Sequence, residues 1–335
     1  MGSKKWMKFL ITLSIFAGVI TWSTAEAPAA KKYTINCLTA WPKTAFESEQ
    51  FLKMIELAQK EADEKYPGQL KIVYKGAGEV IRNREQVEAC RSGLIDMVFT
   101  ATSYYTSIMP EMDTFSLSPM RPWEERATGL YDYIEKLHNQ KANVHFLGRV
   151  GTGTYFYLFL SKSIRVVDDL KGMKIRSSPT NIPFLKLVGV EPVSMPPPDV
   201  YTAMERGVVD GFILPPHTIR DFGLVKPSKY MVQPGIYKAC QTVLINLDVW
   251  NKLPGHLQEL LARHTRGMAR FAIKNILNRV NTEFDSFKKE GMTFINLSPQ
   301  EAEKFKKLAW DALSSTIKKK APVETETILR YFKEK

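Results

Sequence analysis

The sequence predicts an α/β protein with two lobes, a central cleft and a long C-terminal helix that spans both lobes. Three observations lead to this class. Strand-like and helical segments alternate between residues 33 and 100 in the order β-α-β-α-β, which is typical of a parallel sheet covered by helices. A second alternating set begins near residue 150. Residues 254–290 form one nearly unbroken helical pattern, about 55 Å long at 1.5 Å per residue.

The first set has clear boundaries. The apolar stripe of Phe51, Met54, Ile55 and Ala58 predicts a helix over residues 46–65, and Asn83 is expected to cap the next helix. Strands are predicted at 33–38, 70–74, 95–100 and 144–148, with a further helix at 121–141.

The second set runs from residue 155 to residue 214. After it, the long helix contains Gly267, where we expect a kink or break. Ser298, Pro299 and Glu301 then form a capping pattern that starts a last helix reaching Lys320. Strands are predicted at 155–160, 173–176, 192–195 and 210–214, with helices at 182–188 and 200–206.

The N-terminus predicts export. Lys4, Lys5 and Lys8 precede an apolar run, and the small residues Ser23 to Ala25 follow it, which is the order of a cleavable signal peptide over residues 1–25. The run is shorter than the roughly 20 residues that a membrane span needs. We therefore expect a periplasmic protein that carries no membrane anchor once the signal peptide has been removed.

Net charge and cysteine content indicate which partners to expect and whether the thiols are reduced. The net charge is +12, and removing the three lysines of residues 1–25 leaves +9. The longest basic run is Lys318 to Lys320 and no aromatic residues are interleaved with it, so we expect attraction of anions and no nucleic-acid partner. Cys37, Cys90 and Cys240 make an odd number, and we expect reduced, mostly buried thiols.

Catalytic signatures are missing from the sequence. It has no HExxH, GxSxG, GxxxxGK[ST] or CxxC motif and no GxGxxG after a strand. Its five histidines are scattered and share no metal-ligand spacing with the cysteines. We therefore predict no enzyme, no cofactor and no metal. A secreted hydrolase is the competing class, but it would need a nucleophile and base that the sequence does not display.

Four segments in a fixed order resemble one family. They are Glu88–Met97 (EACRSGLIDM), Asp168–Pro179 (DDLKGMKIRSSP), Val188–Pro196 (VGVEPVSMP) and Val200–Gly211 (VYTAMERGVVDG). Together they resemble the extracytoplasmic solute-binding proteins of TRAP transporters, the C4-dicarboxylate-binding DctP family. The resemblance covers essentially the whole mature chain and implies the two-lobed periplasmic-binding-protein fold, type II-like.

Arg176 is the main candidate binding residue. It ends a short predicted strand, where a guanidinium group can hold a carboxylate through two parallel hydrogen bonds. The resemblance implies that it is the family's carboxylate-binding arginine. A surface arginine paired with a carboxylate of its own lobe is the alternative.

Two departures from the family pattern bear on the ligand. Many members have a second ligand-binding arginine twenty residues before the first, where this chain has Phe156, and an amide where it reads Phe212 to Pro215. A buried second carboxylate would then lack polar partners. We therefore expect a monocarboxylate with an apolar or aromatic body. If Phe156 and Phe212 belong to the core, a C4-dicarboxylate or sugar acid remains open.

Other candidates follow predicted strands, where α/β sheets place their ligands. Trp41 follows the first strand and offers a stacking surface, and Glu79 follows the second. The remaining ligand-binding candidates are Thr102, Ser103, Tyr104, Tyr155, Leu214 and His217.

The resemblance also implies partners and domain limits. The partners are a small organic acid and the small and large membrane subunits of a TRAP transporter, and we expect a monomer. A ligand-binding partner of a membrane sensor is the remaining alternative. The first lobe is expected to comprise residues 31–152 and about 242–282. The second is expected to comprise residues 153–241 and about 283–335.

Overall fold

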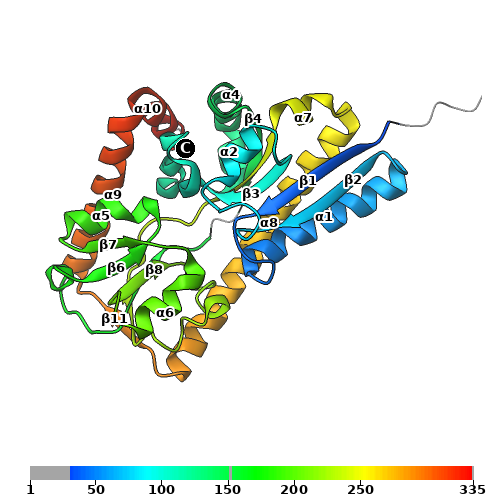
Figure 1. The fold of residues 1–335 in the computed structure, drawn as a ribbon. Helices are drawn as coiled ribbons and strands as arrows, with labels where there is room; N and C mark the ends of the chain where they lie inside the picture. The colour runs from blue at the N-terminus through cyan, green and yellow to red at the C-terminus, as the bar shows by residue number, and fades with distance from the viewer. Residues whose placement is uncertain (1–30, 151–152, 334–335) are drawn as a thin grey trace, which may run out of the picture. The chain divides into compact units, whose positions relative to one another are not determined.

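The computed structural model describes residues 31–150 and 153–333. Their strands form two separate sheets (Figure 1). The predicted signal peptide, residues 1–25, lies outside the described residues. So do residues 151–152, where the predicted limit between the lobes falls, and these domain limits stay a prediction. Between residues 31–150 and 153–333, no helix is both long and apolar enough to cross a bilayer.

The first sheet has the strand order β2-β1-β3-β10-β4. Strand β1 runs parallel to β2 and β3, and β10 runs antiparallel between β3 and β4. Strand β10 therefore returns to the first sheet after the second sheet has begun. The strands are β1 (Tyr33–Thr39), β2 (Leu70–Gly76), β3 (Met97–Ala101), β4 (Val144–Val150) and β10 (Gln241–Asn246).

The second sheet has the order β11-β9-β5-β8-β6-β7. Strand β6 is parallel to β7 and β8, and β5 is antiparallel to β8 and β9. The strands are β5 (Tyr157–Leu160), β6 (Lys174–Ser177), β7 (Glu191–Ser194), β8 (Gly211–Leu214), β9 (Tyr230–Gln233) and β11 (Thr293–Asn296).

Helices pack on both sheets. They are α1 (Phe46–Lys65), α2 (Gln86–Arg91), α3 (Pro122–Ala127), α4 (Leu130–Ala142), α5 (Ile182–Leu187), α6 (Val200–Glu205), α7 (Leu247–Lys252), α8 (Gly255–Lys289), α9 (Pro299–Lys320) and α10 (Pro322–Tyr331). Short 3-10 turns lie between them, among them η1 (Thr102–Tyr105), η2 (Pro110–Leu117) and η4 (Pro179–Asn181).

Most predicted elements are present, and two predictions about where helices begin or end are wrong. The helix expected at 121–141 is two helices, because Gly129 takes a left-handed φ of 80° between α3 and α4. Asn83 does not cap α2, which begins after Glu85 without a side-chain cap. Ser298 does cap α9, accepting a hydrogen bond from the Glu301 N–H at 3.3 Å.

The long helix α8 contributes to the cores of both lobes. Leu257, Leu261 and Met268 pack with residues of the first sheet, whereas Phe287, near the other end, packs with Phe159 of the second. In Figure 1, α8 runs from the first sheet to the second. The helix passes through Gly267 without a break, so the expected break there is wrong. This single helix mechanically links the two cores.

Gly267 provides a test of this continuity. It is exposed in the middle of α8, and a Cβ placed there would meet no atom within 4 Å. Gly267→Ala should therefore raise the free energy of unfolding by roughly 0.5–1 kcal/mol, since alanine has less backbone freedom to lose. Urea denaturation would measure this change. A destabilised variant would contradict an unbroken, unstrained helix at this position.

Candidate functional site

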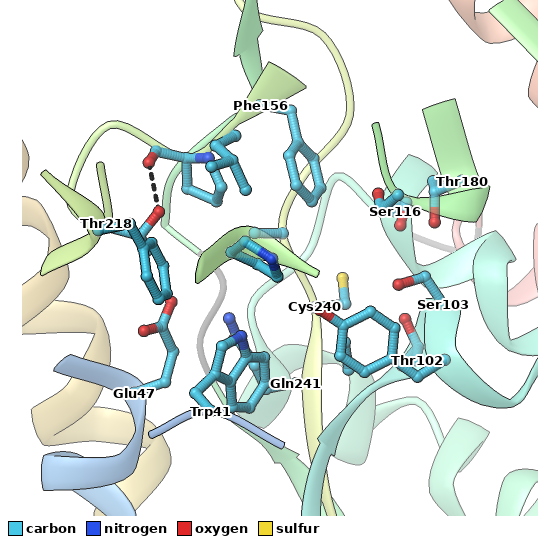
Figure 2. Close-up of a pocket in the computed structure, with 18 of the residues that line it drawn as sticks. Trp41, Glu47, Thr102, Ser103, Ser116, Phe156, Thr180, Thr218, Cys240 and Gln241 are labelled. Carbon is cyan, nitrogen blue, oxygen red and sulfur yellow. Dashed lines mark hydrogen bonds between the residues drawn. The ribbon is translucent and has the colours of Figure 1, made fainter. Parts of the chain in front are cut away.

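A cavity lies between the two sheets and is lined from both lobes (Figure 2). Most of its lining follows strands β1, β3, β6 and β8, at their carboxyl ends, where α/β sheets commonly bind ligands. Strand β10 contributes where it starts. The lining residues are Trp41, Glu47, Ala101, Thr102, Ser103, Tyr104, Ser116, Phe156, Arg176, Ser178, Thr180, Pro197, Leu214, Pro215, Thr218, Phe222, Ala239, Cys240 and Gln241.

Local hydrogen bonds hold the first wall in place. The Trp41 carbonyl accepts from the hydroxyls of Thr39 and Ser48, both at 2.8 Å. The Trp41 ring packs against Phe99 and Tyr104, with ring centres 5.4 and 6.2 Å away. The loop after β1 is therefore tied to the start of α1. These contacts give the cavity one fixed aromatic wall.

Arg176 lies in β6, and its side chain is only 2% exposed. Its Nε and Nη2 groups donate to the Met195 carbonyl at 3.0 and 2.8 Å, and Nη1 donates to the Ile213 carbonyl at 3.5 Å. No carboxylate within residues 31–150 and 153–333 forms an ion pair with it. Burial lowers the pKa of the guanidinium to about 10, so Arg176 remains a cation at neutral pH.

Arg149, in β4, shows the opposite arrangement. It is also buried, but its guanidinium pairs with Glu125, which accepts from Nε at 2.8 Å and from Nη2. Burial alone would lower the pKa of Arg149, and the Glu125 charge outweighs it and raises that pKa. The charge of Arg149 is therefore neutralised within the protein, whereas the charge of Arg176 faces a cavity.

Glu47 is the acidic residue of the cavity. Its side chain is 4% exposed and comes from the first turn of α1. One carboxylate oxygen, Oε1, lies 3.3 Å from Nε2 of His217, which follows β8 in the other lobe. The alignment of these atoms does not make a hydrogen bond, and Glu47 Oε2 has no hydrogen-bond partner in the described chain.

Other contacts join the lobes around the cavity. Asp221 accepts the backbone N–H of Phe46 at 3.0 Å and so caps α1 from the opposite lobe; it also pairs with Arg279 of α8. Elsewhere, Arg84 donates to the Ser194 hydroxyl at 2.6 Å. Each contact is one that separation of the lobes would break.

Seven of the eleven predicted site residues line this cavity. A second cavity adjoins it and shares Trp41, Tyr104 and Arg176 with it; Glu79 lines that second cavity. His217 is fully buried behind Glu47 and packs edge-on against Phe46. The seven are Trp41, Thr102, Ser103, Tyr104, Phe156, Arg176 and Leu214.

Phe212 and Tyr155 lie elsewhere. Phe212 is fully buried and stacks on Phe159 at 5.1 Å, within the core of the second lobe. Tyr155 is 44% exposed and lines a surface groove with Trp310. Tyr155 and Phe156 are successive residues just before β5, and Phe156 lies on the cavity wall whereas Tyr155 lines the surface groove.

Several lining residues were not singled out from the sequence. Ser178 and Thr218 have a local signal, because they stand beside Arg176 and His217. No local sequence signal marks Glu47 or Gln241, since each lies near Arg176 only because segments far apart in the sequence pack together. The others are Ala101, Ser116, Thr180, Pro197, Pro215, Phe222, Ala239 and Cys240.

The described residues contain no group of three or more His, Cys, Asp or Glu side chains arranged to hold a metal ion. Cys37, Cys90 and Cys240 are all buried. Burial raises the pKa of the Cys37 thiol to about 12. Such a thiol is a poor nucleophile at neutral pH.

Comparison with known proteins agrees with this architecture. The sequence model of the bacterial extracellular solute-binding proteins, family 7 (DctP), matches residues 43–320. The chain belongs to this family. Its members are solute-binding proteins of TRAP transport and not enzymes.

One curated relative of this family 7 protein is a monocarboxylate 2-oxoacid-binding periplasmic protein from Nostoc sp.. The two are 27% identical over 237 residues, which is 68% of this chain and 64% of the relative. The match thus spans less than two thirds of the relative's length. An uncharacterized protein from Salmonella typhimurium is 31% identical over 160 residues, 45% of this chain and 48% of its own length.

Solved structures show the same fold at lower sequence identity. A TRAP periplasmic solute-binding protein from Desulfovibrio salexigens, with bound orotic acid, has a TM-score of 0.77 and 17% identity. The alignment covers 90% of this chain and 98% of that one. A sugar-acid-binding protein from Advenella mimigardefordensis in complex with galactonate also has a TM-score of 0.77, with 18% identity and coverage of 91% and 99%. These likenesses establish the two-lobed fold with its bridging helix.

The position of Phe212 leads to a stability prediction. Phe212→Ala should lower the free energy of unfolding by about 3–5 kcal/mol, because it leaves a cavity in the second-lobe core. Phe156→Ala should cost less, since Phe156 is only half-buried. Chemical denaturation of both variants would show the order. Equal losses would contradict a core position for Phe212.

Asp113 predicts a pH dependence of stability. It lies in η2 and accepts a hydrogen bond from Thr180, in η4 of the other lobe, at 2.9 Å. Burial raises its pKa from 3.8 to about 7. A raised folded-state pKa means that its contribution to stability is complete below pH 3.8 and is lost as pH rises through 7. This loss should amount to roughly 2–4 kcal/mol.

The matching variant is Asp113→Asn, which does not titrate. The stability difference between wild type and variant should fall as pH rises from 4 to 8, and calorimetry at intervals across this range would measure it. A difference that stays constant would mean that Asp113 is already ionised in the folded protein at pH 4.

Proposed function

We propose that this chain binds a small organic acid in the cavity between its lobes and delivers it to TRAP transporter membrane subunits. The ligand is a monocarboxylate with an apolar or aromatic body, and Arg176 holds its carboxylate. The observation that carries the proposal is the charge of Arg176. It is buried, cationic and unpaired in the described part of the chain, beside a cavity.

The hydrogen bonding of Arg176 supports a bidentate carboxylate. A guanidinium has five N–H donors. Three are directed at the Met195 and Ile213 carbonyls, which leaves one N–H on each terminal nitrogen without an acceptor in the described residues. Two N–H groups on adjacent nitrogens match the two oxygens of a carboxylate. Binding an anion there also removes the cost of an uncompensated buried charge.

The charge balance of the cavity supports a single carboxylate. Within the described residues, Arg176 is the one basic side chain in the lining, and Glu47 is the one acidic side chain. A second carboxylate of the ligand would have no cation to meet and would be repelled by Glu47. The adjoining cavity, which Arg176 also lines, carries Arg82 and Arg84, so a diacid that reaches into it would meet a second cation.

The walls support an apolar body. Trp41, Phe156, Leu214 and Phe222 line the cavity, and aromatic faces stabilise flat or branched apolar groups by burial. The Nostoc relative is named as a binder of monocarboxylates, which supports a single carboxylate on the ligand.

A sugar acid is the second candidate. Seven hydroxyl side chains also line the cavity: Thr102, Ser103, Tyr104, Ser116, Ser178, Thr180 and Thr218. They would satisfy a polyhydroxylated ligand, and the Advenella protein binds galactonate.

Delivery to a transporter follows from the family. TRAP solute-binding proteins act with membrane subunits, and we propose that the small and large subunits recognise this chain in the periplasm as a monomer. The predicted signal peptide supports export. A ligand that joins Arg176 of one lobe to Glu47 or Trp41 of the other would favour the closed arrangement, which is the form we expect the transporter to bind.

Arg176→Ala tests the carboxylate site. Removal of the guanidinium should weaken binding of a carboxylate ligand by roughly 2–5 kcal/mol, the range for removing one partner of a buried charge pair. Arg206→Ala, an exposed arginine of the same lobe, should leave the dissociation constant unchanged. Isothermal calorimetry would measure both. An unchanged constant in Arg176→Ala would remove Arg176 from the site.

A ligand series tests the class of acid. Aromatic and branched monocarboxylates should bind more tightly than succinate, because the cavity has one cation and apolar walls. Thermal-shift screening followed by calorimetry would rank them. Tighter binding of succinate would contradict the monocarboxylate proposal, and tighter binding of galactonate would favour the sugar-acid candidate.

A further inference from the structure

Glu47 is a buried carboxylate whose hydrogen bonding is incomplete. Its Oε2 atom is buried and has no partner in the described residues. Its Oε1 atom has only the 3.3 Å approach of His217 Nε2, which lacks hydrogen-bond geometry. In Figure 2 the side chain rises from α1 on the same side of the cavity as Thr218. A buried acceptor without a donor is costly, so a donor is expected when the site is filled.

Glu47 is placed where a carboxylate suits its surroundings as a hydrogen-bond acceptor. It stands in the first turn of α1, a helix of 20 residues, where the helix dipole stabilises a negative charge. An ionised carboxylate accepts hydrogen bonds and cannot donate them. The group that completes Glu47 must therefore carry an O–H or N–H.

The protein itself does not supply this donor at Oε2. His217 is fully buried on the other oxygen's side, and the nearby Thr218 hydroxyl already donates to the Pro215 carbonyl at 2.9 Å. Because Glu47 lines the cavity, the donor has to come from a molecule inside the cavity. A ligand held by Arg176 lies in the same cavity.

We propose that Glu47 selects acids that carry a hydrogen-bond donor in addition to their carboxylate: hydroxy acids, lactam acids or amino acids. This inference rests on the proposed function and narrows it. Arg176 takes the anionic end from the second lobe, and Glu47 takes the donor from the first. The ligand then joins the two lobes, because its carboxylate accepts hydrogen bonds from Arg176 and its donor group donates one to Glu47.

The inference has a direct consequence for matched ligands. When O–H or N–H is replaced by a carbonyl or ether oxygen, two acceptors face each other and Glu47 Oε2 stays unsatisfied. A site built to hydrogen-bond a donor rejects such analogues strongly. We expect the dissociation constant of the analogue without the donor to be at least tenfold higher.

Calorimetry with two ligand pairs tests this in the wild-type protein. One pair is phenyllactate and phenylpyruvate, which differ in a hydroxyl against a carbonyl. The other is pyroglutamate and the lactone in which oxygen replaces its ring N–H. The donor-bearing member of at least one pair should bind tenfold or more tightly than its analogue. Equal binding in both pairs, or tighter binding of phenylpyruvate and the lactone, would overturn the inference.

Glu47→Gln tests the residue. Glutamine both donates and accepts, so the preference within each pair should shrink towards one. Glu49→Gln, an exposed carboxylate in the same helical turn, should keep the wild-type ratio. If Glu47 only helped to hold the lobes together, Glu47→Gln would weaken both members equally and leave their ratio intact, which would contradict the inference.

These outcomes are separable from the proposed function. If acids bind and Arg176→Ala abolishes binding, yet no donor preference exists, only the role of Glu47 fails. If no acid binds the wild type, or if Arg176→Ala has no effect, the proposed function fails as well.

Discussion

The cavity depends on one uncompensated charge. Arg176 is buried at the end of β6 and has backbone carbonyls as its partners within the described residues. Carbonyls orient a guanidinium, but they do not neutralise it. Arg149 shows that this chain can neutralise a buried arginine when the role is structural, since Glu125 pairs with it fully. This difference is the reason why we propose Arg176, and not Arg149, as the group that binds the anion.

The two lobes contribute different kinds of side chain to the cavity. The second lobe brings Arg176, and the first brings Glu47 and Trp41 to the same cavity. Neither lobe alone encloses a ligand. Contacts such as Asp221 with Phe46 and Thr180 with Asp113 cross between the lobes, and α8 contributes to both cores. Separation of the two lobes would therefore also take the site apart.

Local patterns predicted most of the elements. The 3.6-residue apolar period placed α1 at its observed limits, and the Ser298 cap placed the start of α9. Errors arose where one residue's backbone decided the outcome. Gly129 takes a left-handed conformation and divides a predicted helix, whereas Gly267 stays helical within α8. Residues of α8 before Gly267 pack in the first core, and Phe287 after it packs in the second. A glycine in a helical pattern permits either result, so sequence period alone does not choose between them.

The sequence by itself determined the family, the alternation of strands and helices, and Arg176 as the central candidate, because each is a local motif or period. Only the tertiary structure decided which side chains meet Arg176. Phe156 reaches the cavity while Phe212 is in the core, since strand register and sheet packing set the side on which each residue lies. Glu47 and Gln241 come from segments 129 positions before and 65 positions after Arg176. No local pattern reports such proximity, which arises only when two sheets pack across a shared cavity.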